Sequence, residues 1–218
     1  VLMLCAAVIS TPVAMFIGTW SALHRDRLVD HGTSLATLIL AALPEFVVGI
    51  ALVIVFSTGV FRMLPAVFVP AGTGPVWADP KQLILPTLTL VLAVGPYIAR
   101  MMRATMLEVL ESDYVRQARL KGLPERTVLL RHALPNAVGP VVQVVALQLA
   151  WLAGGVVVVE FLFRYPGVGF ALVDAVANRD LPVIQALALL IAGLYIAVNL
   201  LADLVSLATN PKVRTAAR

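Results

Sequence analysis

Long stretches without any charged residue constrain this chain more than any other feature. Val1–Leu23, Ala133–Val159 and Leu181–Ala202 contain no Lys, Arg, Asp or Glu. A helix needs about 20 mainly apolar residues to cross a bilayer, and each of these stretches is long enough. Charged residues make up 13% of the chain, against about 25% in an ordinary soluble domain. The sequence therefore predicts membrane-spanning helices and argues against a soluble helical bundle.

Two further apolar runs are interrupted by proline. Ser34–Phe61 is broken at Pro44-Glu45, and the run from Lys81 to Arg100 contains two prolines. The connectors 62–81 and 160–180 contain Pro and Gly and are predicted to be loops, the first of them too rich in both for any regular helix. We expect an all-α polytopic transmembrane bundle that fills residues 1–218 as one domain, with five visible spans. Because Val1 begins within an apolar run, we also expect a further helix upstream.

The basic residues are divided unevenly between the two ends of these spans. One end carries Arg62, Lys81, Arg164 and Arg179, and the other carries the remaining twelve of the sixteen lysines and arginines. Cytoplasmic loops of membrane proteins carry the excess of Lys and Arg. The richer end, which includes the C-terminus, is therefore predicted to be cytoplasmic. The net charge of +4 does not indicate nucleic-acid binding, because the basic residues lie at the ends of apolar runs.

The segment 103–135 is the only long polar stretch. Gly122 is predicted to end one helix in the left-handed conformation, and Pro124 to begin a second that runs to about His132. Leu134-Pro135 is then expected to turn the chain back into the membrane. The first helix is expected to present one apolar stripe, made of Met106, Leu107, Leu110, Tyr114 and Ala118. Two readings stay open: a solvated loop, or a fixed shape whose apolar edge binds a partner.

This segment resembles the cytoplasmic loop of the membrane subunits of bacterial ABC importers. That loop reads Glu-Ala-Ala, three residues, Gly, nine residues, then Ile-x-Leu-Pro. The matching positions here are Ala118, Gly122, Leu134 and Pro135, whereas Arg116, Gln117 and His132 depart from the pattern. The longer run YVRQARLKGLPERTVLLRHALPN is similar to the dipeptide/oligopeptide-type permeases, although Leu120 stands where those usually have Ala.

The resemblance implies a function as well as a fold. In that family the loop forms coupling helices that sit in a groove of a cytoplasmic ATPase. The ATPase-docking residues implied here are Tyr114, Ala118, Arg119, Lys121, Gly122, Leu123, Pro124, Glu125 and Arg126. The implied partners are two cytoplasmic ATPase subunits, a second homologous permease and an extracytoplasmic substrate-binding protein, all at the bacterial inner membrane. The cargo would be peptides or similar small solutes.

A few polar residues within the apolar runs are candidates for a substrate path. Glu45 is the only acid in the middle of such a run, and a charge at the bilayer centre costs about 2.5 kcal/mol or more. It is expected to face water or the protein interior, where it could meet the charged end of a peptide. Gln148 and Trp151 are further path candidates. Hydrogen bonding between helices or interfacial anchoring is the alternative for all three.

The sequence FRYPGVGF follows the fourth run on the predicted outer side. Its residues Phe163, Pro166, Gly167 and Gly169 match the family, which implies an external gate or a contact with the binding protein. A compact interfacial turn is the alternative.

Nothing in the sequence indicates chemistry on this chain. None of its three lysines follows a glycine-rich loop and precedes Ser or Thr, so the phosphate-binding loop is missing. No spacing of His and Cys suggests a metal site. We therefore expect no enzyme activity and no cofactor, with ATP hydrolysis on separate subunits. An intramembrane enzyme or a self-contained secondary carrier that uses Glu45 remains the alternative class.

Overall fold

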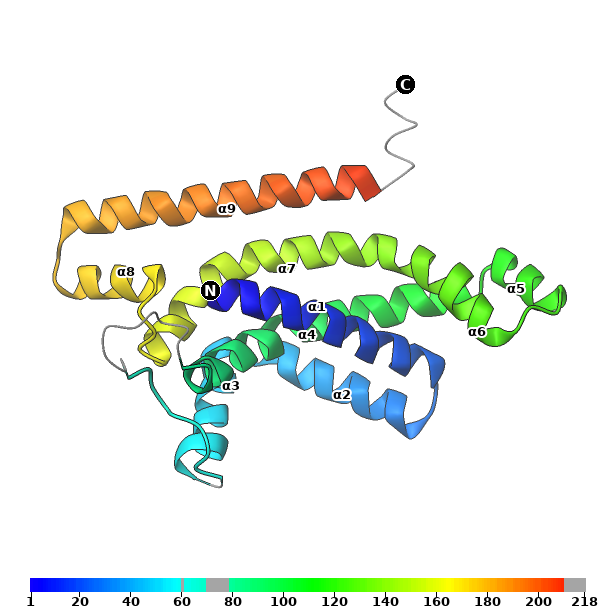
Figure 1. Ribbon diagram of the computed structural model, residues 1–218, viewed down its shortest axis with the longest axis horizontal. Helices are drawn as coiled ribbons and strands as arrows, with labels where there is room; N and C mark the ends of the chain where they lie inside the picture. Colours follow the sequence, from blue (N-terminus) through cyan, green and yellow to red (C-terminus); the bar gives the residue numbers. More distant parts are fainter. Residues whose placement is uncertain (60, 70–78, 210–218) are drawn as a thin grey trace.

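The computed structural model describes residues 1–59, 61–69 and 79–209, and the regular elements in these ranges are all helices, without any strand. Three long helices, α1 (Leu2–Leu23), α4 (Lys81–Leu110) and α7 (Leu134–Leu162), lie side by side (Figure 1). The fourth long helix, α9 (Leu181–Thr209), packs along α7. The cationic tail predicted at the cytoplasmic side, and positions 70–78 of the first long loop, lie outside the described residues.

The second predicted run forms two helices that are bent sharply against each other. Helix α2 (Leu28–Ala42) and helix α3 (Glu45–Val53), which continues into the π-helical turn η1 (Ile54–Thr58), meet at 107°. Pro44 explains the bend, because proline lacks an N–H and forces the preceding residue out of the helical conformation. The predicted break is confirmed. The described residues hold four helices long and apolar enough to span a membrane, or five if the bent pair is one span.

The third predicted run is longer than expected. The sequence interpretation ended it at Arg100 and assigned 103–110 to the polar segment, but α4 continues to Leu110. Residues 101–110 are mostly good helix formers and include neither Gly nor Pro, so nothing stops the helix at the charges. Helix α4 therefore runs without interruption into residues that were assigned to the polar segment.

The polar segment returns to the bundle without the predicted turn. Helix α5 (Asp113–Leu120) is followed by α6 (Glu125–Thr127), the π-helical stretch η2 (Val128–Ala133) and then α7. Leu134-Pro135 was expected to turn the chain back into the membrane, but the chain returns to the bundle here within one continuous helical run. Pro135 lies in the first turn of α7. Proline has no N–H to donate to the preceding turn, and the wider π turn before it accommodates the missing hydrogen bond.

The second predicted loop contains a helix that the sequence interpretation missed. Helix α8 (Val168–Ala177) lies between α7 and α9, close to both. The irregular part of this connection is only 163–167 on one side of α8 and 178–180 on the other.

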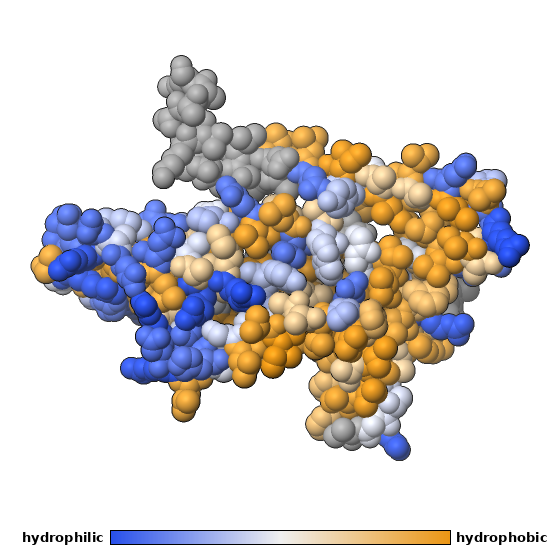
Figure 2. All heavy atoms as spheres, turned by 180° about the vertical axis from the view of Figure 1, so that it is seen from behind, coloured by the Kyte–Doolittle hydropathy of each residue, from blue (hydrophilic) through white to orange (hydrophobic). Residues whose placement is uncertain are grey.

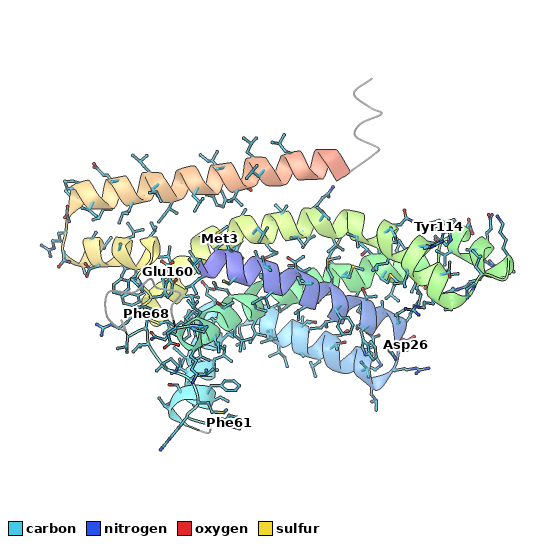
Figure 3. The ribbon with its side chains drawn as sticks, in the orientation of Figure 1. Met3, Asp26, Phe61, Phe68, Tyr114 and Glu160 are labelled. Atoms are coloured by element: carbon cyan, nitrogen blue, oxygen red, sulfur yellow. The ribbon has the colours of Figure 1, made fainter. Side chains whose placement is uncertain are left out.

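The two ends of the molecule are chemically distinct. Asp26 and Tyr114 lie at one end, and Phe68 and Glu160 at the other (Figure 3). Hydrophilic residues gather over the end that carries α5 and α6, with smaller patches at the opposite end and an apolar region between (Figure 2). The described basic residues are thus divided between the two ends, as the count of Lys and Arg predicted.

The buried core is divided along the long axis. One cluster joins α1, α4 and α7 near the α8 end and includes Leu90, Leu152 and Phe163. A second joins the same helices toward the α5 end and includes Met102, Met106 and Val141. The first ends against the turn after α7, and the second supports the base of α5, so each predicted functional end is packed on its own core.

Candidate functional site

A tight glycine corner connects α5 to α6. Gly122 has a φ of +75°, as the sequence predicted. Its N–H donates to the Arg119 carbonyl at 3.0 Å, and the Leu123 N–H donates to the Ala118 carbonyl at 3.4 Å. These two bonds form a Schellman motif, which satisfies carbonyls at the end of α5. The corner is therefore a defined structure rather than a solvated loop.

An ion pair closes the same corner from outside. Arg119 donates from Nη2 and Nε to the Glu125 carboxylate at 2.6 and 3.2 Å, and this hydrogen bond raises the pKa of Arg119. Both side chains are about half exposed, so the pair adds little stability but fixes the direction in which α6 leaves. Pro124 precedes α6 as its N-cap instead of occupying the predicted first helical position.

The apolar residues of this segment divide into a buried face and an exposed tip. Val115, Ala118 and Val128 are buried together and hold α5 against η2. In contrast, Leu120 is 80% exposed, and Tyr114 and Leu123 are also exposed. The predicted single stripe from Met106 to Ala118 was wrong, because α4 ends at Leu110 and α5 starts a new direction at Asp113. An apolar tip in a polar region is a feature of binding surfaces.

A buried ion pair lies at the base of this segment. Asp30, 1% exposed, accepts hydrogen bonds from Arg103 Nε at 2.6 Å and Arg103 Nη2 at 2.7 Å. Ser21 Oγ donates to the same carboxylate at 2.6 Å, and the Asp26 N–H donates to it at 3.1 Å. Such bidentate, fully bonded pairs are the strong form of ion pair in proteins. The network ties α1, α2 and α4 together.

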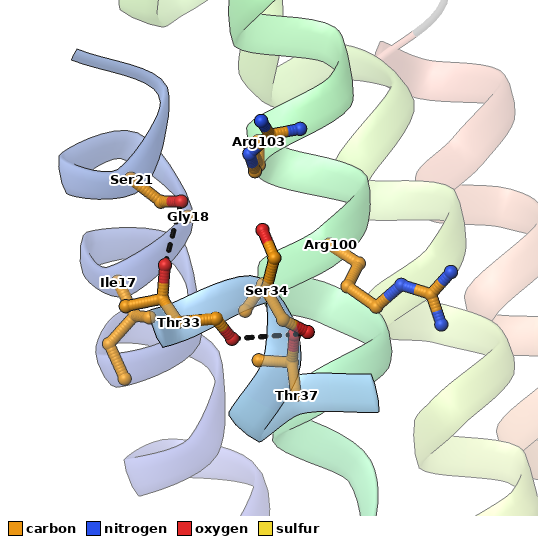
Figure 4. Close-up of a pocket in the computed structure, with 9 residues that line it drawn as sticks. Ile17, Gly18, Ser21, Thr33, Ser34, Thr37, Arg100 and Arg103 are labelled. Carbon is orange, nitrogen blue, oxygen red and sulfur yellow. Dashed lines mark hydrogen bonds between the residues drawn. The ribbon is translucent and has the colours of Figure 1, made fainter. Parts of the chain in front are cut away.

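The neighbourhood of the ion pair is polar although it lies between apolar helices. Thr33 Oγ1 donates to Ser21 Oγ at 2.9 Å, and a small cavity lined by Ser34, Thr37 and Arg100 adjoins them (Figure 4). Arg25 and Glu111 form a second, exposed ion pair between the α1–α2 turn and the end of α4. Two ion pairs therefore connect the α1–α2 turn and the first turn of α2 to α4, the helix that precedes α5.

Glu45 lies at the bend between α2 and α3, where it opens α3. It lines a cavity of about 470 Å³ together with Trp151 of α7 and with Tyr195 and Asn199 of α9. The structure thus brings two of the three predicted path residues together. Gln148 does not line this cavity.

The turn after α7 is built around a buried carboxylate. Glu160, 8% exposed, accepts hydrogen bonds from the N–H groups of Gly169 at 2.8 Å and Phe170 at 3.3 Å, in the first turn of α8. Gly167 packs directly on the carboxylate. A carboxylate at a helix N-terminus satisfies free N–H groups and interacts well with the helix dipole.

The loop after η1 packs against this turn. The Phe68 N–H donates to the Phe163 carbonyl at 2.8 Å, and the rings of Phe68 and Tyr165 meet edge to face. Phe163 is buried, and of the four residues predicted as a gate Pro166 is the most exposed. Phe163, Gly167 and Gly169 therefore have a packing role in this structure.

Comparison with known proteins identifies the family of this helical chain. Residues 14–215 match the family described as "Binding-protein-dependent transport system inner membrane component". The chain belongs to this family. The resemblance drawn from 114–136 is thereby confirmed, and so is the all-α membrane bundle.

Several curated transport permeases are similar along nearly the whole chain. A probable peptide ABC transporter permease of Sinorhizobium fredii is 38% identical over 210 residues, which is 95% of this chain and 66% of that protein. A putative peptide transport system permease of Brucella abortus is 39% identical over 98% of this chain and 68% of its own length. A glutathione transport system permease of Pectobacterium atrosepticum is 40% identical over 98% and 67%. The chain spans about two thirds of the length of these relatives.

In this chain the predicted docking residues lie together around the corner between α5 and α6. All of them are exposed except Ala118, which is buried under α5. Sequence reasoning missed Leu120 as part of the tip, because it was noted only as a departure from the family pattern. It also missed Asp30 and Glu160, for which a lone acid near an apolar run was the available signal.

Proposed function

We propose that this chain is a permease subunit of an ATP-driven importer whose residues 103–135 dock on a cytoplasmic ATPase. The Schellman corner at Gly122, with Leu120 and Leu123 exposed at its tip, carries the proposal. A fixed corner transmits a displacement from a partner, whereas a flexible loop absorbs it.

The continuous helices on either side of the corner support the same role. On one side of the corner, α5 follows the long helix α4 after the short turn at 111–112, and on the other side η2 continues into α7 without a break. Movement of the corner would therefore act directly on two of the central helices. The ion pairs of Asp30 and Arg25 extend this connection to α1 and α2.

The remaining subunits of the proposed importer follow from the family. They are two ATPase subunits, a second homologous permease and an extracytoplasmic binding protein, in the bacterial inner membrane with the C-terminus in the cytoplasm. Between Leu181 and Leu201, α9 has no buried residue in this chain. We assign its outer surface to lipid and to the second permease. The exposed part of the turn around Pro166 is proposed as the contact for the binding protein.

The proposed cargo is a peptide or a peptide-like solute such as glutathione. The named cargoes of the similar permeases support this class. An enzyme or carrier that depends on Glu45 gains no support, because the described residues that line its cavity include no second acid and no histidine.

Binding of the partner ATPase to the assembled, purified transporter tests the docking proposal. A residue other than Gly or Asn pays about 1–2 kcal/mol for the left-handed conformation of Gly122, which corresponds to a roughly 5- to 30-fold loss of affinity. Gly122→Val and Leu120→Asp should each weaken binding and ATP-driven uptake.

Two matched variants control this experiment. Gly122→Asn should keep most of the affinity, because Asn accepts the left-handed conformation. Asn178→Asp, at the opposite polar end, should have no effect. Full ATPase binding and full uptake by Gly122→Val would overturn the proposal.

A further inference from the structure

The cavity at the α2–α3 bend combines groups from three helices that are far apart in the sequence. Glu45 comes from the bend, Trp151 from the middle of α7, and Tyr195 and Asn199 from neighbouring turns of α9. Gly154 and Gly155 form part of its wall. Its volume of about 470 Å³ lies within the range of small-molecule sites.

Among the described residues that line the cavity, Glu45 is the only charged one. Among the side chains that the structure describes, none forms an ion pair or a hydrogen bond with its carboxylate. Two other acids of the bundle differ from Glu45: Asp30 and Glu160 each accept hydrogen bonds from groups of the protein. A carboxylate at membrane depth without a protein partner marks a path for a ligand or an ion.

The neighbours of Glu45 favour a cation of a particular kind. The rings of Trp151 and Tyr195 can bind an organic ammonium group through cation–π attraction, for which Trp is the best partner. Asn199 donates its amide N–H to the Tyr195 carbonyl at 3.0 Å, which leaves the amide oxygen as an acceptor. Acceptors and aromatic rings around one carboxylate suit a primary ammonium, which donates three hydrogen bonds.

We propose that this cavity binds the α-ammonium group of the cargo during its passage. The inference rests on the proposed function as a permease for peptides, since a free α-ammonium is the one cation that unmodified peptides share. Binding would position the N-terminus of the peptide at the bend, between α3, α7 and α9. It would also select against peptides whose N-terminus is acylated.

ATP-driven uptake by the complete transporter in proteoliposomes tests this site. The probes are trialanine and N-acetyl-trialanine, each delivered at saturating binding protein. For Glu45→Gln the concentration of trialanine that gives half-maximal uptake should rise about tenfold, because the substitution removes one charge-assisted hydrogen bond. Uptake of N-acetyl-trialanine should change little. Glu45→Asp should recover part of the preference for trialanine.

Further variants keep the test decisive if Glu45→Gln assembles poorly. Trp151→Leu should lower the preference for trialanine, and Trp151→Phe should lower it less. Gln143→Leu, on the same helix but outside the cavity lining, is the control. An equal loss for both peptides, or no change for either, would overturn the ammonium site. Absence of any uptake by the wild-type transporter would instead count against the proposed function.

Discussion

The buried pair of Asp30 and Arg103 gives the sharpest quantitative prediction. The Asp30 side chain is 2% exposed, whereas the Arg103 side chain is 30% exposed. Removing one partner of a buried pair costs about 3–5 kcal/mol, mostly because the other charge stays buried. Arg103→Met should therefore cost about 3 kcal/mol or more of the free energy of unfolding. Asp30→Asn should cost less, because the guanidinium that it leaves can turn toward water.

A double-mutant cycle separates the pair from general packing effects. The double variant Asp30→Asn with Arg103→Met should lose about 2 kcal/mol less free energy of unfolding than the sum of the two single losses. The reason is that the second substitution no longer leaves a buried charge without its partner. Reversible unfolding of the purified chain in mixed micelles measures these free energies. Arg25→Gln, which breaks the exposed pair with Glu111, is the matched control and should leave stability nearly unchanged.

A coupling energy below about 0.5 kcal/mol would refute this reasoning, since independent sites add to within that value. So would an Arg103→Met variant as mild as Arg25→Gln. Either result would mean that the network does not fix the α1–α2 turn to the base of the docking segment.

The remaining predictions concern the two ends of the molecule. Gly169→Ala places a methyl group 2.5 Å from the Val157 backbone, so α8 must move off α7 and lose its bonds to Glu160, and the thermal midpoint should fall. Gly139→Ala, inside α7 with nothing within 4 Å, is the control and should not lower the midpoint, because Ala favours a helix over Gly. Val115→Ala removes two methyl groups from a fully buried position and should cost about 1.5 kcal/mol; hydrogen exchange should show faster opening of α5, with Tyr114→Ala as the exposed control.

Sequence reasoning succeeded where one local rule decides the structure. Uncharged runs of more than 20 residues leave a helix in a bilayer as the main solution. Pro44 interrupts its helix because proline fixes φ and has no N–H to donate. Gly122 ends a helix because glycine adopts positive φ without a steric penalty. Neither effect depends on the surroundings of the residue. The two polar ends followed from counting charges. These features could be predicted without any tertiary contact.

The failures concern features that neither periodicity nor local composition reports. Asp30 pairs with a residue 73 positions away, so its own surroundings gave no sign of burial. Glu160 holds α8 by a bond that no periodicity reports. The apolar stripe was assigned to one helix because the period of 3.6 continued across Glu111, where the chain in fact changes direction. Tertiary packing also lets η2 and α7 join through Pro135.

The docking of the glycine corner on an ATPase is the central claim, and site-directed cross-linking tests it most directly. Cys5 is the only cysteine, so Cys5→Ala with Leu120→Cys places a single thiol at the exposed tip. A thiol-linked photoreactive group there should cross-link to the ATPase subunit in the assembled transporter, and Asn178→Cys in the same background should not. Cross-linking of equal yield from both positions, or labelling of Leu120→Cys from outside intact cells, would contradict the account.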